Sequence, residues 1–252
     1  MVNCKNHFKI VIPLYNVEKW IRACLNSVLL QDYDNYECVV VDDCSNDKTP
    51  QIIKDMSLPK QFKVITNQKN VGPLENAYLA VIKYSTNLDP ENIVVILDGD
   101  DFFANKNVLT TLNDFYNQQK CWMTYGSYIN LSNKQKGKFS LPVPEKTIQE
   151  NSYRQSPWST SHLRSYKAFL VQKIRMEDLL DAEGKFYRAA GDLAMMFPLL
   201  EMCGPRAKFI DKILYIWNDC SDLNEHKSKR ELQLRCEREI RQAKKYDRLL
   251  ER

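Results

Sequence analysis

The feature that most constrains this chain is the alternation, over its first half, of short apolar runs with segments of helical periodicity. Apolar, β-branched runs are typical of buried strands, and apolar residues three and four positions apart are typical of amphipathic helices. The expected strands are Phe8–Pro13, Tyr36–Val41, Phe62–Ile65, Ile93–Leu97 and Met123–Tyr128, and the expected helices are Val17–Leu30, Lys48–Met56, Leu74–Tyr84 and Asn107–Gln118. This order predicts an α/β fold, with a mostly parallel, doubly wound sheet and helices on both faces.

The second half of the chain is less regular. Its polar stretch 131–156 predicts a loop, and the segments that follow predict two helices and a strand, over Trp158–Gln172, Gly191–Met202 and Ala207–Tyr215. The charged tail 227–252 predicts a C-terminal helix packed on the domain, with peripheral membrane or partner contact as the alternative. A length of 252 residues suits one large domain, here 1–226, rather than two independent ones.

Charge and cysteine content disfavour several classes of protein. With 36 basic and 32 acidic residues, the net charge of +4 is too small to favour nucleic acid as the main partner, but it suits an anionic nucleotide. We expect no transmembrane segment and no signal peptide, because no stretch approaches ~18 apolar residues and the N-terminus lacks a signal pattern. The eight cysteines form no CxxC pair, which disfavours a zinc site and predicts free thiols in the cytoplasm.

Acidic residues follow two of the expected strands at the point where each strand ends. The second strand is followed by Asp42 and Asp43, and the apolar run IVVIL is followed by DGDD at 98–101. Open α/β sheets bind ligands at the carboxyl ends of their strands, so both clusters are expected at the binding edge. Two carboxylates one residue apart suit Mg²⁺ or Mn²⁺ and the diphosphate that such an ion carries. The alternative for 98–101 is an acidic turn that simply ends a strand.

Three blocks of the sequence resemble the family-2 inverting glycosyltransferases, which have the Rossmann-like GT-A fold. KIVIPLYNVEKWIRACLNSVLLQDYDNYECVVVDDCSNDKT is similar to the opening signature of that family, and NQKNVGPLENAYLAV and VVILDGDDFFANKNVL are similar to its second and third blocks. The likeness is looser from residue 110 to about 227, where PWSTSHLRSYKAFL, AAGDLAMMFPLLEMCG and ILYIWND resemble blocks of one bacterial and viral branch. The resemblance implies a nucleotide-sugar-binding half over 1–120 and an acceptor and catalytic half over 121–226.

The resemblance assigns the donor nucleoside to loops at this edge. Pro13, Tyr15 and Asn16 match the loop that lines the nucleoside site, with Tyr15 able to stack on the base. Asp43 matches the aspartate that accepts a hydrogen bond from the imide N–H of uracil, which implies UDP as the carrier. Asn70 matches the loop on the base and ribose side. Each residue also has a local alternative. Tyr15 would pack within its turn, Asp42 and Asp43 would cap the next helix, and Asn70 would belong to an ordinary turn.

The acidic cluster matches the DxD motif of the family. The match implies that Asp98 lies near the ribose, that Asp100 holds the Mn²⁺ or Mg²⁺ bridging the two phosphates, and that Asp101 supports one of these roles. His226 matches a late histidine that completes the metal or diphosphate site in many GT-A enzymes, with an exposed loop histidine as the alternative.

Inversion requires a carboxylate that removes the proton of the acceptor hydroxyl. The best match to the family's base is Asp192 in RAAGDLAMMF. The family more often has an acidic pair at this helix start, where the chain has Gly191 before Asp192, and a helix-capping role is the alternative. Glu177 and Asp178 are less favoured as the base.

Three further residues of the second half, Trp158, His162 and Arg164, are expected to shape an acceptor or diphosphate pocket, with core packing or a structural role as the alternative. The expected function is transfer of a sugar from a metal-bound UDP-sugar to a glycan, lipid-linked or protein acceptor. A sugar nucleotidyltransferase is a second hypothesis, although PLYNVEKW is not a glycine-rich phosphate loop. A nucleotide-sugar-binding module without turnover is a third, although the acidic cluster is intact.

Overall fold

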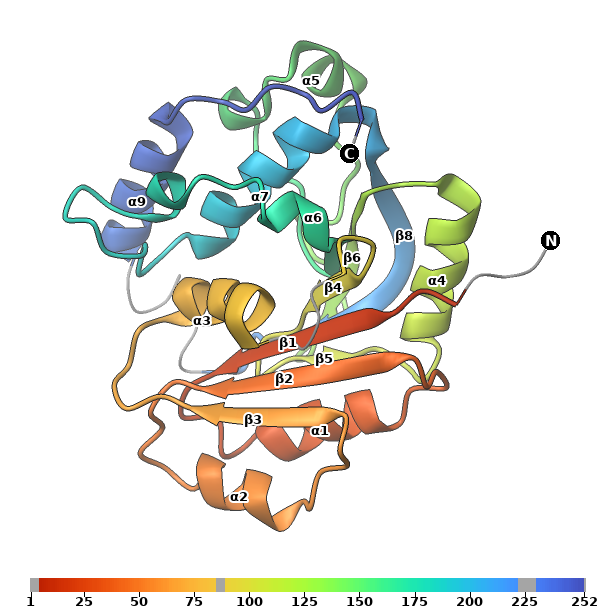
Figure 1. The fold of residues 1–252 in the computed structure, drawn as a ribbon, viewed down its shortest axis with the longest axis vertical. Coiled ribbons are helices and arrows are strands. Elements are labelled where there is room, and N and C mark those ends of the chain that lie inside the picture. Colours follow the sequence, from red (N-terminus) through yellow and green to blue (C-terminus); the bar gives the residue numbers. More distant parts are fainter. Residues whose placement is uncertain (1–4, 85–88, 222–229, 252) are drawn as a thin grey trace.

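The computed structural model describes residues 5–84, 89–221 and 230–251. Within them eight strands form one sheet in the order β3-β2-β1-β4-β7-β6-β8-β5 (Figure 1). The strands are β1 Phe8–Leu14, β2 Tyr36–Asp42, β3 Phe62–Thr66, β4 Ile93–Ile96, β5 Phe102–Phe103, β6 Met123–Asn130, β7 Arg164–Lys167 and β8 Ala207–Trp217. Strands β3, β2, β1 and β4 are mutually parallel, as are β6 and β8, whereas β7 is antiparallel to β4 and β6, and β5 to β8. The expected α/β class is confirmed.

Each face of the sheet has its own hydrophobic core. Ile10 and Ile12 of β1 belong to one core and Val11 to the other. The first core packs on α1 (Ile21–Leu29), α2 (Thr49–Asp55) and α4 (Val108–Gln119), and the second on α3 (Pro73–Leu79), α6 (Ala168–Val171) and α7 (Gly191–Cys203). Burial on both faces explains why β1, β2 and β4 are continuous apolar runs. The four helices expected in the first half are present, and the third continues as a π-helical turn, η1 (Ala80–Tyr84).

The second half departs from the sequence prediction in two places. The helix expected over 158–172 is wrong, because the segment contains strand β7 and only the short α6. Strand β7 lies between β4 and β6, and the ladders on both of its sides override the local helical pattern. The loop expected over 131–156 contains short helical segments, α5 (Glu145–Glu150) and η2 (Tyr153–Gln155). Two further single turns are η3 (Met176–Leu179) and η4 (Gly204–Arg206).

The charged tail is helical only in part. Helix α9 spans Arg230–Gln242, buries Cys236 and Ile240, and packs against α7. The following residues are not helical, because their backbone bonds to the domain instead: the Tyr246 N–H donates to Glu201 Oε2 over 3.0 Å. Glu201 also pairs with the buried Arg154, whose Nε lies 2.7 Å from Glu201 Oε1. The expected packing of α9 on the domain is confirmed, and the expectation of helix to the end of the chain is wrong.

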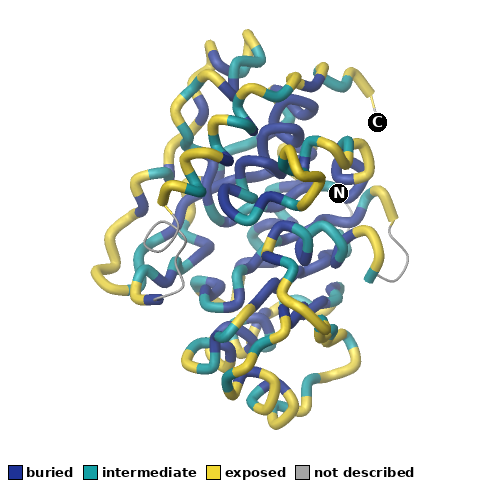
Figure 2. Tube along the Cα trace, turned by 90° about the vertical axis from the view of Figure 1, so that its left-hand side faces the viewer, coloured by how far each residue is buried: buried dark blue, intermediate teal, exposed yellow. Residues whose placement is uncertain are grey.

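The buried positions run through the middle of the molecule, and exposed positions gather on the outer loops and helices (Figure 2). Among the helices of residues 5–84, 89–221 and 230–251, none has both the length and the apolar character needed to cross a membrane.

Candidate active site

Parallel pairing brings the ends of β1, β2 and β4 to one edge of the sheet. Leu14 is in register with Asp42, and the Asp43 N–H donates to the Leu14 carbonyl over 2.9 Å. The loop after β4 packs against β1, and the Gly99 N–H donates a hydrogen bond to the Pro13 carbonyl over 3.1 Å. A Cβ at Gly99 would lie 2.4 Å from the Cβ of Leu14, so only glycine allows this approach. The loops that carry the expected donor residues are therefore adjacent.

Asp43 is buried beneath the loop that connects β3 to α3. Its Oδ1 accepts hydrogen bonds from the Val71 N–H over 2.8 Å and the Asn67 amide over 2.9 Å, and its Oδ2 accepts from the Gly72 N–H over 2.8 Å. A carboxylate has about four acceptor positions, so one on Oδ2 is left for a ligand. Neighbouring Asp42 is also buried, and its Oδ2 has no hydrogen-bond partner within the described part of the chain.

The other expected nucleoside residues lie around Asp43. Pro13 is in β1, and Tyr15 is 36% exposed directly after that strand, so its ring is accessible to a base. Asn16 has a left-handed backbone (φ 52°) and accepts a hydrogen bond from the Asn46 N–H over 2.8 Å. Asn16 therefore joins the loops after β1 and β2. Asn70 donates to the Asp43 backbone carbonyl over 3.3 Å.

The three aspartates after β4 have different environments. Asp98 and Asp100 are half-buried, and Ser221 hydrogen-bonds to the Asp100 carboxylate. Asp101 is buried, and both its oxygens are occupied: the Tyr215 hydroxyl donates to Oδ2 over 2.5 Å and the Asn218 N–H donates to Oδ1 over 2.6 Å. The sequence did not point to these two partners, which lie more than a hundred residues away.

The pKa values in this cluster show crowded carboxylates. Burial raises the pKa of Asp101 well above its usual value, and repulsion from Asp100 and Asp98 raises it further. Burial also raises the pKa of Asp100. The pKa of Asp98 is raised by burial, against the lowering effect of the Arg164 guanidinium. A divalent cation would offset this repulsion, and oxygen donors suit Mg²⁺ or Mn²⁺.

His162 lies beside the cluster, in the segment before β7 rather than at the start of a helix. Its ring stacks on Tyr215 at a centroid distance of 4.4 Å. Partial burial, then the charge of Arg164, lowers its pKa well below the usual value, so the imidazole is neutral. Ligand atoms of Asp98, Asp101 and His162 lie within 4.8 Å of one another. His226, the expected metal ligand, lies outside the described residues.

The residues present fit a divalent ion at Asp100 better than at the group that includes His162. The oxygens of Asp101 are already occupied, and Arg164 Nη2 lies 3.0 Å from His162 Nδ1, where it would repel a cation. Within residues 5–84, 89–221 and 230–251, the side-chain contacts of Asp98 are long, 3.5 Å to the Tyr215 hydroxyl and 3.9 Å to Arg164. Its carboxylate is thus free to meet a metal or a ribose.

Arg164 brings the two halves of the chain together. One of its Nη atoms lies 3.9 Å from Asp98 Oδ2, and the other lies 3.9 Å from Asp192 Oδ2. Asp192 is the second residue of α7, and its side chain is 37% exposed, so an acceptor hydroxyl can reach it. The alternative base Asp178 faces elsewhere, because the Tyr246 hydroxyl donates to its Oδ2 over 2.5 Å. Among the candidate bases, Asp192 is therefore the one that Arg164 links to the aspartate cluster.

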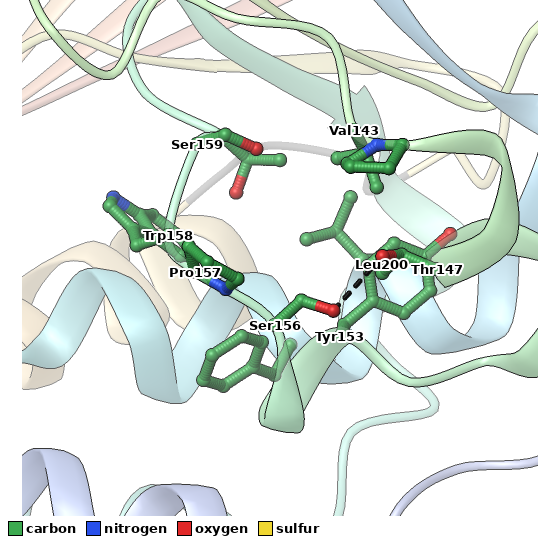
Figure 3. Close-up of a pocket in the computed structure, with 11 residues that line it drawn as sticks. Val143, Thr147, Tyr153, Ser156, Pro157, Trp158, Ser159 and Leu200 are labelled. Carbon is green, nitrogen blue, oxygen red and sulfur yellow. Dashed lines mark hydrogen bonds between the residues drawn. The ribbon is translucent and has the colours of Figure 1, made fainter.

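Trp158 lines a crevice between α5, η2 and α7. Figure 3 shows Trp158 and Pro157 on one side of it, with Val143 and Thr147 across from them. The Trp158 ring meets Phe197 edge-on at 5.7 Å. The free volume of the crevice is about 10 Å³, which holds about one water molecule. A sugar ring could stack on Trp158 only if the crevice opened.

Replacing Tyr215 by phenylalanine is expected to destabilise the protein by about 1–3 kcal/mol, because it leaves buried Asp101 Oδ2 without its donor. The midpoint of thermal unfolding should fall by about 2–4 °C per kcal/mol. Tyr166→Phe is the matched control, because this buried tyrosine has a hydroxyl without a partner in the described residues and should tolerate the change. Equal midpoints for the two variants would show that the bond to Asp101 contributes nothing.

Comparisons with known proteins show the family to which this chain belongs. The model of the family "Glycosyl transferase family 2" matches residues 9–175. The chain is 28% identical over 185 residues to the glycosyltransferase GlyA of Streptococcus pneumoniae, covering 71% of this chain and 24% of GlyA. It is 31% identical over 134 residues to an Escherichia coli protein, UDP-Glc:alpha-D-GlcNAc-diphosphoundecaprenol beta-1,3-glucosyltransferase WfgD, covering 53% of this chain and 50% of WfgD.

A solved structure has the same fold. Residues 1–349 of Staphylococcus aureus TarS, named as a poly(ribitol-phosphate) beta-N-acetylglucosaminyltransferase, superpose with a TM-score of 0.65 at 26% identity. The match covers 84% of this chain and 60% of that structure. The expected GT-A fold is confirmed. This chain spans half or less of the full length of GlyA and WfgD.

Proposed function

Because the chain belongs to glycosyl transferase family 2, we propose that it is an inverting glycosyltransferase, which moves a sugar from a UDP-sugar to an acceptor hydroxyl. One observation carries the proposal: Arg164 lies 3.9 Å from both Asp98 and Asp192. Arg164 therefore links the aspartate cluster of the donor half to an accessible carboxylate of the acceptor half, an arrangement that suits group transfer between two substrates.

The donor nucleoside would lie on Asp43, Tyr15 and Asn70. Asp43 Oδ2 has one acceptor position left for the imide N–H of uracil, and the exposed Tyr15 ring is available to stack on the base. The name of WfgD, which gives UDP-Glc as its donor, supports a UDP-sugar here. Pro13 and Asn16 would shape the loop around the base.

Asp100 would hold the divalent ion, and Asp98 would lie toward the ribose. The buried Asp101 would support the loop that carries both residues. When bound, Mn²⁺ or Mg²⁺ supplies a Lewis acid that stabilises the departing diphosphate. Asp101, through its bonds to Tyr215 and Asn218, fixes the loop on which Asp98 and Asp100 stand. His226 stays a predicted ligand.

Asp192 would act as the general base. The acceptor oxygen attacks the anomeric carbon on the face opposite UDP, Asp192 takes the hydroxyl proton, and the bond from the anomeric carbon to the diphosphate oxygen breaks. The names of WfgD and TarS both specify β-linked transfer, which supports inversion because UDP-glucose and UDP-N-acetylglucosamine carry the sugar in the α configuration.

The acceptor would be a glycan, a lipid-linked glycan or a protein, held on the side of α7 and β7. His162 and Arg164 stand on that side of the aspartate cluster and would meet the acceptor or the diphosphate. A peripheral membrane contact through α9 and a cytoplasmic location stay predictions from the sequence.

A donor screen tests the proposal. Purified protein is incubated with UDP-, GDP- and TDP-sugars, with Mn²⁺ or with EDTA, and free nucleoside diphosphate is measured. We expect slow, metal-dependent release of UDP from one UDP-sugar, with water as the acceptor. A separate incubation contains a sugar phosphate and UTP. Release of pyrophosphate there would instead indicate a nucleotidyltransferase. Metal-dependent UDP binding without release from any donor would indicate a binding module without turnover.

A further inference from the structure

Two segments far apart in the sequence are joined beside the proposed donor site. The first is the donor loop, residues 67–72 between β3 and α3, and the second is the helix entry, residues 188–192, which leads into α7. The Arg188 guanidinium connects them: Nη2 donates to Asn70 Oδ1, and Nη1 donates to the Asn70 backbone carbonyl over 3.4 Å. No sequence motif pointed to Arg188, because its partner lies 118 residues away.

The two segments are also closely packed. A Cβ at Gly72 would lie 3.1 Å from Arg188 Nη1, so the guanidinium lies against the backbone of the donor loop. A Cβ at Gly191 would lie 2.9 Å from the Cβ of Leu74, so α7 begins in contact with the first turn of α3. Figure 1 shows α3 and α7 on the same side of the sheet. The donor loop and the helix entry therefore form one packed unit.

The donor loop is itself fixed to the proposed nucleoside carboxylate. Asp43 accepts hydrogen bonds from the N–H groups of Val71 and Gly72, both 2.8 Å long, and its backbone carbonyl accepts from the Asn70 amide. A chain of hydrogen bonds thus runs from Asp43 through Asn70 to Arg188. Only residues 189–191 separate Arg188 from Asp192, and Ala190 among them has a left-handed backbone with φ 54°.

We propose that Arg188 is a positioning residue, which holds the start of α7, and with it Asp192, in register with the donor loop. The proposal rests on the proposed function, because it requires Asp192 to be the base. The hydrogen bonds to Asn70 and the packing of Gly191 on Leu74 fix this register. Arg188 acts through these contacts and does not touch the reacting atoms.

The test compares Arg188→Met, which removes both hydrogen bonds and keeps much of the side-chain length, with Arg188→Lys, which keeps the charge and can restore one bond. Turnover is measured as UDP release to water at saturating UDP-sugar, and UDP affinity is measured separately by calorimetry with Mn²⁺. We expect Arg188→Met to lower kcat by about 10- to 100-fold, the effect of a misplacement near 1 Å. UDP affinity should stay within about threefold of wild type, and Arg188→Lys should recover part of kcat.

Two controls separate positioning from other effects. Arg22→Met makes the same substitution at an exposed arginine of α1 and should leave kcat unchanged. In a double-mutant cycle, Asn70→Ala should add little to the kcat loss of Arg188→Met, because both changes break one contact. If Arg188→Met unfolds, Arg188→Lys carries the same comparison, with a smaller fall in kcat.

Wild-type kcat in both Arg188 variants, or a loss confined to UDP affinity, would overturn the positioning role while leaving the proposed function intact. A wild-type protein that releases UDP from no UDP-sugar would overturn the proposed function, and the positioning role with it.

Discussion

Asp100→Ala is expected to abolish the metal dependence of donor binding and to lower turnover by at least about 10³-fold, because a bound metal ion contributes several kcal/mol of charge stabilisation. The measurement is UDP affinity with Mn²⁺ and with EDTA, together with UDP release from the UDP-sugar. In wild type the affinity should be higher with Mn²⁺ than with EDTA, and in Asp100→Ala the two values should be equal.

The same variant should not be less stable than wild type. Repulsion from Asp100 is one cause of the raised pKa of buried Asp101, so removing Asp100 relieves the crowded cluster. We therefore expect an unchanged or higher midpoint of thermal unfolding without metal, which separates loss of the metal site from misfolding. Asp211→Ala is the matched control, since this exposed aspartate pairs with Lys136 at the surface. Mn²⁺-dependent UDP binding that survives Asp100→Ala would place the metal elsewhere.

Asp192→Asn is expected to bind UDP with wild-type affinity and to lower kcat by about 10²–10⁴-fold, the usual contribution of a general base. Asparagine has nearly the same shape and keeps the Oδ1 that accepts from the Leu193 N–H, so the start of α7 should be preserved. The amide cannot take the proton of the acceptor. The measurement is single-turnover UDP release, with calorimetry for UDP affinity.

Glu177→Gln makes the corresponding acid-to-amide change at the alternative base. Glu177 is exposed on η3, beside an aspartate that is bonded to Tyr246 rather than to the aspartate cluster, and the change should leave turnover as it is. Full activity of Asp192→Asn, or loss of activity in Glu177→Gln, would show that the base assignment is wrong.

The first half of the fold could be predicted because its signals are local. Strands β1, β2 and β4 are buried on both faces and so have apolar sequences, and the polar residues of the site begin within two positions of the end of each strand. Strand β7 could not be found in this way, because it is four residues long and its partners come from distant parts of the chain.

The same distinction applies to the site. Asp98, Asp100 and Asp43 were predictable because they end strands of a recognisable pattern. The bonds of Tyr215 and Asn218 to Asp101, and of Arg188 to Asn70, join residues more than a hundred positions apart. No periodicity or short motif records such pairs, and only the folded chain brings them together.

Sugar transfer with inversion, assisted by a base on the side opposite the nucleotide, is the proposal that most needs a direct test. The most direct measurement is proton NMR of the anomeric signal during the first minutes of reaction with an α-linked UDP-sugar, with water as the acceptor and before the free sugar equilibrates. We expect the β-anomer to appear first, and its formation to be slower by about 10²–10⁴-fold in Asp192→Asn. Initial release of the α-anomer would contradict the proposal.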